Sequence, residues 1–113
     1  MAPEVYFKKK YTTKADIWAL GVVIFKTFTN KKPYVVDLET IKSKFSAWKP
    51  KARRTFERSL NKCKIYNLDL VKLLFGEGEG NDKNSMFAVK YKHRCDIKKV
   101  KFLFEKVSYM LNY

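Results

Sequence analysis

Several groups of residues in this chain have types that could do chemistry. Cys63, His93 and Cys95 are potential zinc ligands, but they lack the paired Cys-x-x-Cys spacing of a tetrahedral site. The segment from Gly76 to Gly80 alternates glycine with glutamate, and its acids would repel the phosphate that a glycine-rich loop normally binds. We therefore expect structural cysteines, a surface histidine and a flexible loop from Gly76 to Ser85, with no metal-binding residue.

The segment from Trp48 to Arg54 combines an aromatic residue with a basic cluster, which are the ingredients of a nucleic-acid contact. The formal net charge of the chain is +14, and it comes mainly from lysine. Lysine together with abundant Asn, Phe, Tyr and Ile is also what an AT-rich genome encodes, and such a surface attracts acidic partners non-specifically. We expect nucleic-acid binding only of this non-specific kind, and a small basic nucleic-acid-binding protein remains the alternative function.

Length and composition predict one packed domain. The 113 residues are 46% hydrophobic and 16% aromatic, which exceeds what a disordered chain of this charge carries. Two cysteines make no disulfide scaffold, and no signal peptide is recognisable, so we expect an intracellular protein whose compartment is unknown. The longest apolar run, Ile17 to Phe25, is shorter than the roughly 20 residues of a membrane-spanning helix, and no membrane partner is predicted.

The hydrophobic periodicity predicts helices only, and therefore an all-α fold. Thr13 and Asp16 resemble a capping box that starts a helix over 14–28, which is apolar on nearly every side and so belongs at the centre of the fold. Asp37 can cap a second helix that Pro50 ends. Its apolar stripe consists of Leu38, Ile41, Phe45 and Trp48.

Three further helices are expected in the second half of the chain. A weaker one covers 51–61, and a short apolar one covers 68–75 between a capping Asn67 and a terminating Gly76. An amphipathic helix covers 96–111 and docks through one face. That face consists of Ile97, Val100, Phe104, Val107 and Leu111. The segment over 86–91 is too brief to assign.

Two strings near the start of the chain carry a family resemblance. Met1-Ala2-Pro3-Glu4 resembles the end of a protein kinase activation segment, and Asp16-Ile17-Trp18-Ala19-Leu20-Gly21 resembles the central helix that follows it. The chain thus resembles the C-terminal lobe of a eukaryotic protein kinase of the serine/threonine type, closely over 1–34 and more weakly over 35–113. The resemblance implies one domain, residues 1–113, that is a helical partial C-terminal lobe with one buried central helix.

The resemblance also implies structural roles for particular residues. In the family, the Ala-Pro-Glu glutamate pairs with a buried arginine, so we expect an ion pair between Glu4 and Arg94. Asp16 matches the aspartate that accepts amide hydrogen bonds from the catalytic loop, although it can equally serve as a helix cap. Val23 and Thr27 match positions that support the hydrophobic spines. The structural family residues of this chain are Ala2, Pro3, Glu4, Asp16, Trp18, Gly21 and Arg94.

The family's catalytic residues have no match among these 113 residues. His93-Arg94-Cys95-Asp96 is similar in wording to the His-Arg-Asp catalytic loop, but it follows the central helix and contains an extra cysteine. We expect it to be a helix start. No catalytic, cofactor-binding or metal residue is predicted, because ATP and magnesium belong to the complete family domain. The expected function is a truncated, inactive kinase lobe that interacts with another kinase or kinase lobe, and an incomplete gene model of an active kinase is the other alternative.

Overall fold

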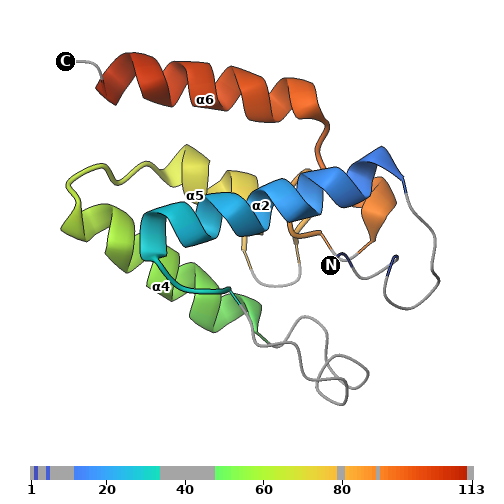
Figure 1. Ribbon diagram of the computed structural model, residues 1–113, viewed down its shortest axis with the longest axis horizontal. Coiled ribbons are helices and arrows are strands. Elements are labelled where there is room, and N and C mark those ends of the chain that lie inside the picture. Colours follow the sequence, from blue (N-terminus) through green and yellow to red (C-terminus); the bar gives the residue numbers. More distant parts are fainter. Residues whose placement is uncertain are drawn as a thin grey trace.

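The computed structural model describes Ala2, Val5 and residues 12–33, 48–78, 81–88 and 90–111, with the backbone alone over 107–111. These residues form four α-helices and one 3-10 helix, with no strand among them (Figure 1). The helices are α2 (Thr13–Thr29), α4 (Lys49–Lys62), α5 (Leu68–Phe75), η1 (Tyr91–His93) and α6 (Ile97–Leu111). The predicted all-α fold is confirmed, while the helix expected after Asp37 lies outside the described residues.

Helix α2 crosses the middle of the molecule and packs against α4 and η1 (Figure 1). Its bounds agree with the prediction to within one residue. The capping residue was misassigned, because the hydroxyl of Thr12 accepts the Lys14 amide at 3.2 Å and Thr13 is already helical. Asp16 lies in the first turn, where the helix dipole favours a carboxylate. Asn30 ends the helix in the left-handed conformation.

Helix α4 is longer than the weak helix that the sequence predicts. Pro50 was expected to end a helix, which was wrong: α4 begins at Lys49, and Pro50 lies in its first turn, where the missing N–H of a proline costs nothing. Ala52, Phe56 and Leu60 recur every fourth residue and are buried, so a single stripe attaches α4 to the core. The aromatic rings of Phe56 and Phe25 stack across the α2–α4 contact with centroids 5.8 Å apart.

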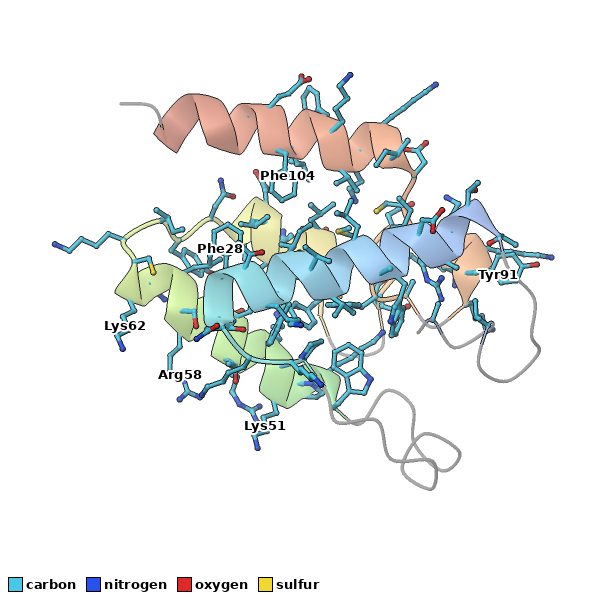
Figure 2. All side chains as sticks on the ribbon, viewed as in Figure 1. Phe28, Lys51, Arg58, Lys62, Tyr91 and Phe104 are labelled. Carbon is cyan, nitrogen blue, oxygen red and sulfur yellow. The ribbon has the colours of Figure 1, made fainter. Side chains whose placement is uncertain are left out.

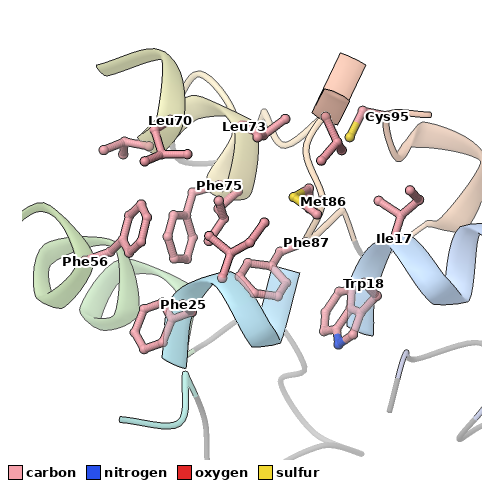
Figure 3. Close-up of a cluster of buried hydrophobic side chains, with 14 of the residues drawn as sticks. Ile17, Trp18, Phe25, Phe56, Leu70, Leu73, Phe75, Met86, Phe87 and Cys95 are labelled. Carbon is pink, nitrogen blue, oxygen red and sulfur yellow. The ribbon is translucent and has the colours of Figure 1, made fainter. Parts of the chain in front are cut away.

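Helix α5 begins and ends as predicted. The Asn67 side chain accepts the Asp69 amide at 2.8 Å, and Gly76 closes the helix with φ of +88°. Helix α5 lies in a hydrophobic core to which every described helix except η1 contributes buried residues. Figure 3 shows most of these side chains. They include Trp18, Phe25, Phe56, Leu60, Leu70, Val71, Leu73, Leu74, Phe75 and Val100.

The segment 86–88 forms a part of the core that the sequence does not reveal. Met86, Phe87 and Ala88 are fully buried. The Met86 amide donates to the Leu73 carbonyl at 2.7 Å, and the Phe87 amide donates to the Leu74 carbonyl at 3.0 Å. These bonds satisfy carbonyls that the last turn of α5 leaves without helical partners. A short non-helical segment therefore takes a central place in the fold.

The described part of the loop 76–85 is held by hydrogen bonds, which corrects the picture of a flexible loop. The Glu77 amide donates to the Asn81 carbonyl at 3.1 Å, and the Asn81 amide donates to the Gly78 carbonyl at 3.1 Å. Ser85 at its end is fully buried. The loop thus returns the chain tightly from α5 to the segment 86–88.

Helix α6 lies along α5 and begins one residue after the predicted start (Figure 1). Val100 is buried and Phe104 is half-buried, as the amphipathic pattern requires. The placement of Ile97 on the docking face was wrong, since 56% of this residue is exposed. Ile97 has the right helical phase, but it lies in the first turn, before the helix passes over the core. None of the described helices has the length and apolar character needed to cross a bilayer.

We predict that Gly76→Ala lowers the free energy of unfolding by more than about 2 kcal/mol, because a side chain at positive φ is strained. A Cβ at this position would also lie 2.5 Å from the Asn81 carbonyl oxygen. Gly78→Ala is the matched control, since its Cβ would meet nothing within 4 Å. Urea denaturation of both variants is the measurement, and equal effects would contradict the prediction.

Candidate functional site

The side chain of Arg94 is the most buried charge that the structure describes. Its Nε donates to the Ala88 carbonyl at 2.7 Å, and its Nη1 donates to the Lys14 carbonyl at 2.9 Å. The guanidinium carbon lies 4.9 Å from the centroid of the Trp18 ring, which is a cation–π distance. Arg94 therefore connects the segment 86–88 to the first turn of α2.

Lys14 also donates a hydrogen bond to the backbone of Arg94. Its Nζ donates to the Arg94 carbonyl at 2.9 Å, so each of these residues donates from its side chain to the other's backbone across 80 positions of sequence. We call this pair the Lys14–Arg94 clasp. It fixes the start of α2 against the turn that leads into α6. Sequence reasoning missed Lys14, since nothing distinguishes this lysine from the many others.

The spacing of Trp18 and Gly21 has a direct packing explanation. Trp18 is fully buried, and its ring meets Phe87 edge-on with centroids 5.2 Å apart. Gly21 lies almost one turn later on the same side of α2, and a Cβ there would approach Phe87 to 3.1 Å and Met86 to 3.2 Å. The tryptophan and the glycine thus shape one surface of α2 to receive the segment 86–88.

A second surface of α2 points away from this core. Asp16, Ala19, Val23 and Thr27 are all exposed and follow one another at helical spacing, and we call them the α2 outer face. Val23 is 57% exposed. The Thr27 hydroxyl donates to the Val23 carbonyl at 2.8 Å. Neither Val23 nor Thr27 joins the buried core, so the predicted spine positions are at the surface here.

The expected partner of Arg94 cannot be placed, because Pro3 and Glu4 lie outside the described residues. Ala2 is buried in the core, and the Val5 amide donates to the Ala2 carbonyl at 3.1 Å. The ion pair between Glu4 and Arg94 stays a prediction.

The other candidate sites of the sequence separate in space. Cys63 is exposed, while burial raises the pKa of the Cys95 thiol and keeps it protonated. No group of described residues could hold a metal ion. Asp96 directly precedes α6, and its carboxylate accepts the Lys99 amide at 3.1 Å, so the string does lead into a helix start.

The basic cluster is divided by the fold. Lys49 forms an ion pair with Asp82 at 2.7 Å, although burial lowers the pKa of its ammonium group. Arg53 pairs with Glu57 at 3.2 Å and donates to the Gly76 carbonyl at 3.0 Å. Trp48 is half-buried, and its ring packs edge-on against Phe87. Only the remaining members, Lys51 and Arg54, are exposed.

Comparison with known proteins identifies one family. The model of the protein tyrosine and serine/threonine kinase family matches residues 1–68. Among curated proteins, the serine/threonine-protein kinase unc-51 of Caenorhabditis elegans is 46% identical over 35 residues, which are 31% of this chain and 4% of the relative. Calcium-dependent protein kinase 6 of Plasmodium berghei is 56% identical over 34 residues, or 30% of this chain and 2% of the relative.

A third relative, the serine/threonine-protein kinase shk2 of Schizosaccharomyces pombe, is 49% identical over 35 residues, which are 31% of this chain and 6% of the relative. The chain therefore matches only a small part of each of these relatives. No solved structure matches the chain significantly.

We predict that Arg94→Lys lowers the free energy of unfolding by about 2–3 kcal/mol. A lysine ammonium is a point charge and cannot reproduce the planar fork that reaches both Ala88 and Lys14, so buried carbonyls lose their donor. Arg58→Lys is the control, because this arginine is exposed on α4 and its change should stay within about 0.5 kcal/mol. Urea denaturation followed by circular dichroism compares them, and equal midpoints would refute the role of the clasp.

We also predict energetic coupling between Glu4 and Arg94. A double-mutant cycle with Glu4→Gln and Arg94→Met, each of which removes one charge, should give a coupling free energy of about 1–3 kcal/mol, as residues of one buried charge network do. The same cycle with Glu105→Gln, an exposed glutamate on α6, should be additive. Additivity in both cycles would rule out the ion pair.

Proposed function

The chain belongs to the protein tyrosine and serine/threonine kinase family, and we propose that its 113 residues act as a helical C-terminal-lobe segment that docks onto another kinase lobe and does not itself transfer phosphate. The observation that carries this proposal is the α2 outer face, where an apolar and polar stripe of the central helix remains exposed. The match to the kinase family covers residues 1–68, which contain this helix.

The absence of activity in these residues is inferred from the chemistry of phosphoryl transfer. That reaction requires a lysine on the phosphates, an aspartate that accepts the hydroxyl proton, and carboxylate and amide ligands for magnesium. The sequence contains no match to the motifs that supply them, and no described group of carboxylates fits a metal ion. These residues therefore do not fit ATP with magnesium, and we derive no catalytic step for them.

The α2 outer face supports the docking part of the proposal. In the family resemblance, Asp16 is the residue that accepts backbone amides of the catalytic loop. Here its carboxylate is exposed in the first turn of α2, and Val23 lies two turns further along the same face. An exposed carboxylate and an exposed β-branched side chain about 10 Å apart along one helix face can both contact one extended partner segment. We propose that this segment comes from another kinase lobe.

We predict that the added chain changes the kinetics of a related kinase. The assay measures kcat/KM of shk2 with a peptide substrate while the concentration of the chain is raised, and we expect a saturable change. Val23→Lys should abolish the effect, because it places a charge in the apolar contact. Phe102→Lys is the matched control, since Phe102 is also an exposed apolar residue, 65% exposed against 57% for Val23, and it lies on α6, outside the α2 outer face.

The chain alone, incubated with magnesium and ATP, should transfer no phosphate to the same peptide. An unchanged kcat/KM at saturating chain would remove the docking proposal, and equal effects of both lysine variants would remove the assignment to α2.

A further inference from the structure

The outward side of α4 carries a continuous row of basic residues. Lys51, Arg54, Arg58 and Lys62 are all exposed and lie three, four and four positions apart. At 100° per residue they fall within an arc of about 80°, and over eleven residue steps they extend about 16 Å along the helix. We call these four residues the α4 basic row, and Figure 2 shows Lys51, Arg58 and Lys62 pointing away from the body of the protein.

The row is free of acids. Glu57, the acidic residue of α4, lies beside the row and is bound to Arg53 at 3.2 Å. The neighbouring members of the row are therefore like-charge pairs at i,i+3 and i,i+4 spacing, which destabilise a helix. The first turn of α4 also lacks an acid, so its lysines face the positive end of the helix dipole. A bound polyanion would relieve both repulsions.

The arginine content of the row is unexpected for this chain. Lysine supplies most of the positive charge, and the arginines are Arg53, Arg54, Arg58 and Arg94. Arg53 and Arg94 are used in internal hydrogen bonds, which leaves Arg54 and Arg58 at the centre of the exposed row. A codon bias toward lysine does not explain this pair. The planar guanidinium fork of arginine matches phosphate oxygens with two hydrogen bonds.

We propose that the α4 basic row binds the phosphate backbone of double-stranded DNA without reading its bases. The arc holds only Lys51, Arg54, Arg58 and Lys62, and Thr55 and Asn61 border it about 20° beyond its two edges, so the face includes no aromatic residue. Single-stranded nucleic acids are bound largely through base stacking on aromatic side chains, so this face favours a duplex. The wide major groove of B-form DNA admits a helix, so the row can lie along the phosphates that border this groove, whereas the major groove of A-form RNA is deep and narrow. Trp48, the aromatic residue of the original cluster, packs its ring against the core residue Phe87.

The test is fluorescence anisotropy with a labelled, mixed-sequence DNA duplex and the full chain. Four phosphate contacts predict a slope of about −3.6 for log K against log salt, so the affinity should fall about 10²-fold between about 50 and 200 mM salt. Arg54→Gln combined with Arg58→Gln should reduce this slope by about 2 and weaken binding to every sequence equally.

The matched control is Lys101→Gln combined with Lys106→Gln, which removes the same charge from exposed positions of α6. It should leave the slope unchanged. Circular dichroism melting checks that both double variants fold, and the α4 variant should be at least as stable as the parent chain because it loses a repulsion. Equal slopes for the two double variants would overturn the proposal and reduce binding to general electrostatics. Tighter binding of single-stranded DNA, double-stranded RNA or poly-glutamate than of the duplex would also overturn it.

Discussion

The guanidinium of Arg94 is buried, and a buried cation is stable only where acceptors surround it. The structure supplies them from the first turn of α2 and from the segment 86–88, through carbonyls of Lys14 and Ala88. The ring of Trp18 covers one side of the charge. Because these groups come from distant parts of the sequence, the position of this one side chain sets how α2, the segment 86–88 and the start of α6 meet.

The hydrophobic core is arranged around the same junction. Phe87 lies against Trp18 and Phe75, and it reaches α2 at the position where Gly21 has no side chain. The amides of Met86 and Phe87 meanwhile use the carbonyls at the end of α5. The hydrogen bonds and the apolar contacts therefore hold the segment 86–88, which has no regular secondary structure, in the same position. A sequence specifies a unique fold when its hydrogen bonds and its hydrophobic packing favour the same arrangement.

Two surfaces remain outside this arrangement, and they differ in character. The α2 outer face is a mixed apolar and polar stripe of the family's central helix, whereas the α4 basic row is a purely cationic ridge. They belong to different helices, so each can be altered without touching the other. The proposed lobe contact and the proposed DNA contact can thus be examined separately in one protein.

The sequence by itself determined the family, the all-α class and the ends of α2, α5 and α6 to within about a residue, because caps and periodicity act over a single helical turn. The sequence-based prediction wrongly assigned the cap of α2 to Thr13. It also placed Ile97 on the docking face of α6, because hydrophobic periodicity indicates which side of a helix a residue lies on but not how far the core extends along that helix. Only the tertiary structure decided that the segment 86–88 is core, that Lys14 meets Arg94, and that Arg54 and Arg58 point outward while Arg53 points in. Those outcomes depend on contacts between residues far apart in the chain, and no local pattern encodes which distant atoms a side chain will reach.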